Sequence, residues 1–218
     1  ETFNMLFPNF VGGSSHAKLS EKSNLYQALI TNGISKRDSR NFIKAVPLYF
    51  GPQSFTSGPV YIGSVIWLLF VIALFAFKKP VKWVFLSLIV FSFLLAWGKY
   101  FPWMTNLFLD YFPLYNKFRT VSMILIIAQF LIPVLAIIGF NHFLYSELKL
   151  NDKKKIIIQS LFVLTGLSVF FLVFGNMLFN FQSHLDSQLQ FPNWLIDALV
   201  QDRKDLFKLD IIRSLFFI

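Results

Sequence analysis

Four stretches of this chain contain no Asp, Glu, Lys or Arg, and each is close to the length of a helix that crosses a lipid bilayer. A spanning helix needs ~20 predominantly apolar residues to cover a hydrocarbon core of ~30 Å. A soluble domain would interrupt such runs with polar surface positions, whereas here only 14% of all residues are charged. We therefore expect an all-α integral membrane protein. The predicted complete transmembrane helices are residues 59–77, 83–98, 121–145 and 156–179.

The rest of the chain connects these spans in a polytopic helix bundle. A fifth, truncated transmembrane helix is expected to start at residues 211–218. Neither end resembles a finished terminus, so we expect a piece of a longer protein whose other helices are partners of this segment. The remaining segments, outside the hydrocarbon, are turns at 78–82 and 146–155, an outer loop at 99–120, and loop and short-helix segments at 1–58 and 180–210.

Lysines predict which side of the membrane each connection occupies. Residues 78–82 carry three Lys and residues 146–155 carry four. Basic residues in short loops stay cytoplasmic, so these two turns are assigned to the cytoplasm and segments 1–58, 99–120 and 180–210 to the outside. The net charge of +9 is then explained by contact with membrane lipids. No nucleic-acid partner is expected.

Short helices are expected in the outer segments. Leu25 to Ile30 reads as a helix with Ser23 or Asn24 as its N-cap, because these side chains accept hydrogen bonds from first-turn amides. Pro133 predicts a kink inside the third span. The other expected short helices are Thr105–Phe112, capped by Thr105, and two separate helices at Trp194–Val200 and Asp202–Phe207.

Familiar catalytic and cofactor motifs are absent from these residues. There is no nucleotide-binding glycine motif, no GxSxG and no HExxH. The chain has no Cys, and its three His lie in different segments without the spacing of metal ligands. No cofactor or metal site is therefore identified, although a divalent metal requirement stays open. The spans carry almost no ionisable groups, which argues against a proton pump or an ion channel.

The densest group of reactive side chains lies in the outer loop, from Asp110 to Arg119. Lys117 and Arg119 are suited to bind the phosphate of a lipid-linked donor. Tyr111 and Tyr115 are suited to stack on sugar faces or to lie at headgroup level, and Asp110 to orient a hydroxyl or a metal. The alternative is an interfacial anchor whose basic side chains extend to the headgroups without a catalytic role.

A second charged group, Asp202-Arg203-Lys204-Asp205 with Asp210 and Arg213, precedes the predicted fifth span. Arg203 and Arg213 are secondary candidates for substrate binding. The alternative is a charged helix surface, with Arg213 at the membrane end of the fifth span. No catalytic residue is assigned.

Several stretches resemble the YfhO-like bacterial multi-pass membrane proteins, in the form found in Bacteroidetes. The resemblance runs over nearly the whole chain, and FPLYNKFRT and FTSGPVYIG are its most specific parts. The stretches are FPNFVGGSS (7–15), PLYFGPQSFTSGPVYIG (47–63), LLAWGKYF (94–101), LDYFPLYNKFRTVSMILIIA (109–128) and DRKDLFKLDIIRSLFFI (202–218).

This resemblance implies a GT-C glycosyltransferase-like protein of the bacterial inner membrane. Such enzymes transfer a sugar from a polyprenyl-phosphate carrier to an extracytoplasmic acceptor of the cell envelope. The family's catalytic acid usually lies in the first outer loop, which we expect outside this segment. Two alternatives stay open: a non-catalytic membrane subunit or scaffold of an envelope complex, and a transporter of lipid-linked sugars.

Overall fold

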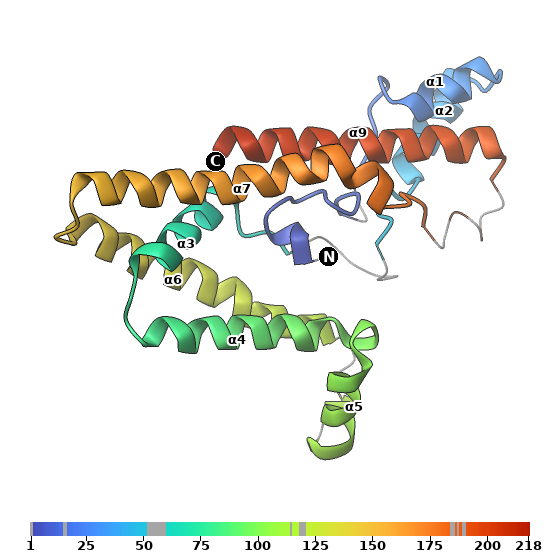
Figure 1. Cartoon of the computed structure of the whole chain (residues 1–218). Coiled ribbons are helices and arrows are strands. Elements are labelled where there is room, and N and C mark those ends of the chain that lie inside the picture. Colours follow the sequence, from blue (N-terminus) through green and yellow to red (C-terminus); the bar gives the residue numbers. More distant parts are fainter. Residues whose placement is uncertain are drawn as a thin grey trace. The chain divides into compact units, whose positions relative to one another are not determined.

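The computed structural model describes residues 2–14, 17–51, 60–113, 115–117, 121–183, 186, 188 and 191–218. Within these ranges every regular element is a helix (Figure 1), which confirms the predicted all-α class. The chain divides into two compact units. Unit 1 contains Phe3–Tyr61 and Thr165–Phe217, and unit 2 contains Ile62–Leu164.

Two helices are long and apolar enough to cross a membrane. The first is Ser122–Tyr145, which includes most of a short 3-10 turn (η4, Val121–Ile124) and all of α6 (Leu125–Tyr145). The second is α7 (Leu150–Leu178). In the most apolar 18-residue stretch of each helix, only 28% and 22%, respectively, is buried within the protein. The core helix of a soluble domain would be mostly buried. Two further apolar helices are shorter: α3 (Ser64–Ala76) and α4 (Val81–Ala96).

The short helices differ from the predicted four complete spans. At 1.5 Å per residue, the 13 residues of α3 rise only ~20 Å, less than the ~30 Å hydrocarbon core. The chain before Ser64 is not helical, and Gly63 there adopts φ +114°. This conformation is incompatible with a helix, so α3 cannot extend further toward the N-terminus. Helix α7 starts before the predicted span and includes residues 150–155, which belong to the predicted turn 146–155.

Unit 2 is held together mainly by α3 and α6, with α4 also packed on α6. A methyl group at Gly139 of α6 would overlap the side chain of Ala73 on α3, so the two backbones are closely apposed. Small residues permit such contacts between membrane helices. Ile72, Ala76 and Phe143 form a buried cluster against which Ile156 of α7 also packs. Pro133 lies inside α6.

Unit 1 is organised along α9 (Asn193–Phe217). Its buried apolar residues are spaced by four or eight positions, which places them on one face of the helix. Helices α1 (Asn24–Thr31) and α2 (Lys36–Ala45) form a core with the N-terminal half of α9. The residues of this face are Leu195, Leu199, Phe207 and Ile211.

Seven phenylalanines form a second packing group of unit 1. They come from the N-terminal loop, the C-terminal half of α7 and the segment after it, and α9. Ring centroids of contacting pairs lie 4.7–6.4 Å apart, within the range of favourable aromatic contacts. They are Phe3, Phe7, Phe10, Phe171, Phe179, Phe181 and Phe207.

The local helix predictions had mixed outcomes. Ser23 is the N-cap of α1, and its hydroxyl accepts a hydrogen bond from the amide of Tyr26, as predicted. The prediction that Thr105 caps the outer-loop helix is wrong. That helix, α5 (Pro102–Tyr111), begins three residues earlier, and the Thr105 hydroxyl donates to the carbonyl of Gly98. Proline is favoured in a first helical turn, which accounts for the earlier start.

One continuous helix, α9, includes both short helices expected between residues 194 and 207. It also includes the predicted start of the fifth span. Helix α9 passes through the polar sequence at which the sequence predicts a break. Three of its charged residues bond to segments elsewhere in unit 1, as described next.

Candidate functional site

The predicted loop residues lie at the end of α5 and in a following 3-10 turn, η3 (Tyr115–Lys117). Asp110, Tyr111 and Lys117 are exposed, Tyr111 with 82% of its surface. No hydrogen bond or ion pair joins these three side chains in the described part of the chain. Arg119 lies outside the described residues. The exposed acid, phenol and ammonium groups are therefore accessible to a ligand.

Tyr115 differs from its neighbours because it is partly buried. Its ring packs on Phe108 of α5, with centroids 5.5 Å apart. Its hydroxyl is buried and has no hydrogen-bond partner among the described residues. Burial raises the pKa of Tyr115, so the phenol is neutral at physiological pH. It is positioned to support the η3 turn against α5 rather than to stack on a ligand.

The surface around α5 is rich in exposed aromatic and aliphatic side chains, and only Met104 of this helix is buried. Aromatic residues of this kind are enriched where a protein meets the membrane interface. The surface suits both the lipid-phosphate and the interfacial-anchor interpretations of the loop. The exposed residues are Tyr100, Trp103, Leu107, Leu109, Tyr111 and Phe112.

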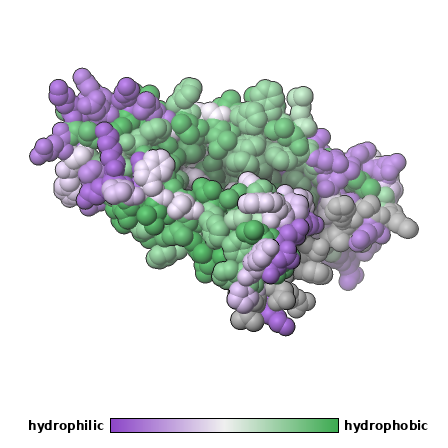
Figure 2. All heavy atoms as spheres, turned by 60° about the horizontal axis from the view of Figure 1, so that its bottom comes forward, coloured by the Kyte–Doolittle hydropathy of each residue, from purple (hydrophilic) through white to green (hydrophobic). Residues whose placement is uncertain are grey.

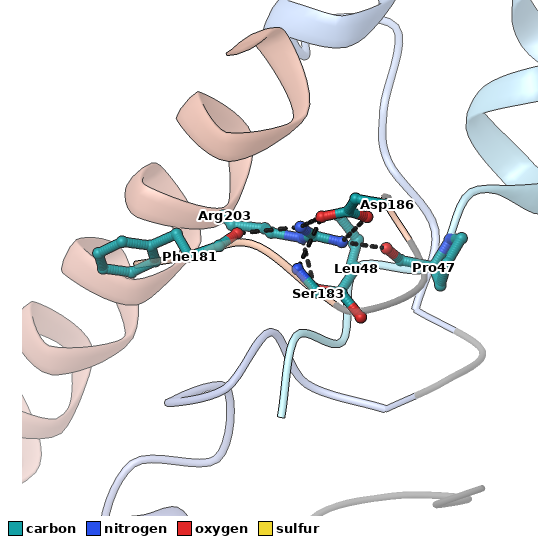
Figure 3. Close-up of polar contacts among 6 residues, drawn as sticks. All are labelled: Pro47, Leu48, Phe181, Ser183, Asp186 and Arg203. Carbon is teal, nitrogen blue, oxygen red and sulfur yellow. Dashed lines mark hydrogen bonds and ion pairs between the residues drawn. The ribbon is translucent and has the colours of Figure 1, made fainter. Parts of the chain in front are cut away.

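Arg203 of α9, a secondary candidate, is fully buried in unit 1 (Figure 3). Its Nη1 and Nη2 atoms donate to the Asp186 carboxylate at 2.5 and 3.1 Å. The same guanidinium donates to backbone carbonyls at three other positions. These are Leu48 at 3.1 Å from Nε, Pro47 at 3.0 Å from Nη2 and Phe181 at 2.9 Å from Nη1.

These five hydrogen bonds occupy all five N–H groups of the guanidinium. In this arrangement none is left to bind a phosphate. Arg203 instead ties Pro47 and Leu48, and also Phe181 and Asp186, to α9. A buried arginine requires such compensation, because an unpaired buried charge is strongly unfavourable.

Two aspartates of α9, Asp202 and Asp210, accept hydrogen bonds from backbone amides of distant segments. Asp202 accepts from the amides of Asn24 and Leu25 at 2.7 and 2.9 Å, and from the Asn24 side chain. These are the first two amides of α1, which have no partner within a helix. A carboxylate at this position also opposes the positive end of the helix dipole. Asp202 and Ser23 together satisfy the first three amides of α1.

Asp210 holds the N-terminal loop. It accepts from the backbone amide of Asn9 at 2.7 Å and from its side-chain nitrogen at 3.1 Å. Burial raises the pKa of Asp210, opposed by the Asn9 hydrogen bonds and by the charge of Arg213. Arg213 itself is exposed. Among the described residues it forms no ion pair, so it is the secondary candidate that stays accessible.

The sequence did not reveal the partners of these charges. Asp186 and Asn9 were not singled out, and Asn24 was named only as a possible helix cap, because the three residues are about 17 to 200 residues from the side chains they meet. One signal was available: Asp202, Arg203 and Asp210 fall on the same helical face as Leu199 and Phe207. Charged residues on an apolar face need buried partners.

No group of three or more His, Cys, Asp or Glu residues suited to a metal ion occurs in the described ranges. No protein-family model, curated protein or solved structure matches this chain.

Proposed function

We propose that this chain is part of a bacterial inner-membrane protein that transfers a sugar from a polyprenyl-phosphate carrier to an acceptor of the cell envelope. One observation carries the proposal. Asp110 and Tyr111 are exposed at the end of a helix whose surface is rich in exposed aromatics, and Lys117 is exposed in the 3-10 turn that follows. The resemblance of residues 109–128 to YfhO-like proteins supports the same chemistry. A donor whose lipid tail stays in the bilayer would have to react at such a surface.

The proposed topology has four spans at residues 59–77, 83–98, 121–145 and 156–179 and a fifth that begins at 211. Loop 99–120 then lies outside the cytoplasm. The two apolar helices long enough to cross a membrane support this topology in part. Helices α3 and α4 would cross with the help of their flanking residues or a locally thinner bilayer.

In the proposed reaction, Lys117 and Arg119 bind the donor phosphate and stabilise the charge that develops on it as the sugar leaves. Asp110 orients the acceptor hydroxyl or a metal, and Tyr111 contacts a sugar face. The acid or base that completes the reaction is expected in another part of the parent protein.

A second function, a non-catalytic subunit of an envelope complex, is favoured by a specific observation. Four buried charged residues hold other segments of unit 1 onto α9: Asp186, Asp202, Arg203 and Asp210. These four charged residues therefore serve architecture rather than substrate binding.

The test uses the full parent protein in native membrane vesicles, supplied with polyprenyl-phosphate carrying a radiolabelled sugar. Lys117→Ala and Arg119→Ala are compared with Lys99→Ala, which removes the same charge at the other end of the same loop. A transferase predicts label transfer by wild type, a loss of about tenfold or more in the first two variants, and little change in the control.

Two other outcomes contradict parts of the proposal. If wild-type vesicles transfer no more label than vesicles from a deletion strain, the enzyme is rejected in favour of the subunit. If all three variants lose activity equally, the loop acts as a charged interfacial anchor and not as a phosphate-binding site.

A further inference from the structure

The two lysine-rich turns of unit 2 lie at the same end of its helix bundle (Figure 1). One joins α3 to α4 and the other joins α6 to α7. The ring of Phe77, directly after α3, meets the ring of His142 near the end of α6, with centroids 5.4 Å apart. Ile156, in the second turn of α7, packs with Ala76 and Phe143 from the ends of α3 and α6. Residues from both turns are therefore brought to one surface.

A lysine that donates a hydrogen bond to a carbonyl at the end of the preceding helix holds each turn. Lys82, at the start of α4, donates to the carbonyl of Leu74 near the end of α3 at 3.0 Å. Lys153, at the start of α7, donates to the carbonyl of Leu144 near the end of α6 at 2.9 Å. The last carbonyls of a helix have no partner within it and carry the negative end of its dipole. These two lysines therefore have structural roles.

The other five lysines of the turns are exposed, and they outnumber the two exposed acids there, Glu147 and Asp152. Neither acid forms an ion pair among the described residues. The five lysines, called here the basic end, are Lys78, Lys79, Lys149, Lys154 and Lys155.

Two large aromatic side chains are exposed at the basic end. Trp83 follows Lys82 in the first turn of α4 and is 67% exposed, and Tyr145 is the last residue of α6 and is 83% exposed. Trp and Tyr are enriched at the boundary between hydrocarbon and headgroups. Figure 2 shows hydrophilic residues gathered at its left-hand end, beside a largely hydrophobic surface. The combination indicates a bilayer boundary and not merely a charged, solvated turn.

We propose that the basic end is a docking surface for anionic lipid headgroups of the leaflet around it. The exposed ammonium groups pair with headgroup phosphates, while Trp83 and Tyr145 fix the depth of the helices in the bilayer. Basic clusters beside membrane helices attract anionic lipids in this way. The proposal rests on the membrane location of unit 2 and is independent of any sugar transfer.

The test measures lipid selectivity of the full parent protein in nanodiscs of phosphatidylcholine with one fifth phosphatidylglycerol. Spin-labelled lipids report the fraction of each type that is immobilised at the protein. Wild type is expected to immobilise phosphatidylglycerol several-fold more than phosphatidylcholine at low salt, and less selectively at high salt. Replacing the five lysines by Gln is expected to abolish most of this preference, whereas replacing them by Arg retains it.

A matched control removes equal charge from unit 1, through Gln at Lys18, Lys22, Lys36, Arg37 and Lys44, all of them exposed. It is expected to keep the preference. The variant with only Lys78→Gln and Lys79→Gln retains the second turn, so insertion is preserved, and an intermediate preference is expected.

The proposal is overturned if wild type shows no preference at low salt, or if the five-lysine Gln variant keeps it. It is overturned as well if the control loses the preference equally, because the effect would then follow total charge and not this surface. Displacement of phosphatidylglycerol by soluble polyglutamate would point to an acidic protein partner instead.

Discussion

Arg203 and Asp186 form an ion pair whose side chains are 0% and 4% exposed. The pair connects α9 to a segment 17 residues earlier, and the same arginine reaches back about 155 residues to the carbonyls of Pro47 and Leu48. A single side chain therefore joins three parts of unit 1. The arrangement is sensitive to change, because losing one partner leaves the others buried without hydrogen bonds.

Replacing Arg203 by Ala is expected to lower the unfolding free energy of unit 1 by about 3–5 kcal/mol, the cost of leaving a buried charge unpaired. Arg203→Lys keeps the charge but cannot supply the planar fork that reaches three carbonyls, so we expect a smaller, still clear loss. Hydrogen exchange of residues 40–51 in detergent reports the release of this segment. Lys204→Ala, the adjacent change, is the control, and equal exchange in all variants would contradict the structural role.

Removing the Asp202 carboxylate is expected to destabilise α1. Asp202→Ala leaves the amides of Asn24 and Leu25 without their partners, a loss comparable to removing an N-cap, about 1–2 kcal/mol. Faster amide exchange throughout Asn24–Thr31 would show it. Asp205→Ala removes only exposed side-chain hydrogen bonds, so little change is expected. If both variants exchange alike, Asp202 does not cap the helix.

Acid pH is expected to favour the folded state through Asp202 and Asp210. Burial, the largest cause, raises the pKa of both carboxyls above the ordinary value of 3.8. The folded state therefore holds these protons to higher pH than the unfolded state. Their contribution to stability is greatest below pH 3.8 and is lost as pH rises through the raised pKa values.

The measurement is the unfolding free energy of wild type and of the Asp202→Asn, Asp210→Asn double variant between pH 3.5 and 6.5. The unfolding free energy of wild type should fall relative to that of the variant as pH rises. The altered hydrogen bonds of the variant change its unfolding free energy by the same amount at every pH, so they do not affect this trend. Arg213→Ala removes a charge that lowers the pKa of Asp210. In this variant the stabilisation by protonated Asp210 should therefore persist to higher pH before it is lost. A relative gain by wild type with rising pH would reverse the assigned direction.

Some local sequence signals predicted local structure correctly. The Ser23 cap, the helix after it and the long apolar helices follow from hydrogen-bonding preferences and from runs without charge, which are read within a few residues. The continuity of α9 was not predicted, because Gln201-Asp202-Arg203-Lys204 looks like a polar junction. Two of these side chains are buried only because Leu25 and Leu48 supply partners from the other end of the chain.

The binding roles of the candidate site residues stay predictions. Asp110, Tyr111 and Lys117 are exposed in the described loop, consistent with accessibility, but ligand chemistry was inferred from residue types alone. Arg203 was a secondary candidate for substrate binding because it lies in the charged cluster that precedes the predicted fifth span. Its five donors are all used inside the protein, a fact that depends on tertiary contacts and not on spacing.

The close contact of α3 and α6 makes a sharp test of unit 2. A Cβ at Gly139 would overlap the Cβ of Ala73 and lie 2.8 Å from its Cα. Gly139→Ala must therefore push the helices apart, and overpacking of this kind costs about 1–3 kcal/mol. Without the contact, the same change would stabilise the helix slightly, since Ala has the higher helix propensity. The sign of the effect thus decides whether the contact exists.

Gly166→Ala in α7 is the matched control, because a Cβ there meets nothing within 4 Å. We expect the thermal midpoint in detergent to fall for Gly139→Ala and to stay unchanged or rise for Gly166→Ala. Adding Ala73→Gly to Gly139→Ala removes one overlapping methyl group while the α-carbon stays close, so partial recovery is expected. Equal midpoints for both single Gly→Ala variants, or no recovery in the double variant, would mean that α3 and α6 are not packed through these residues.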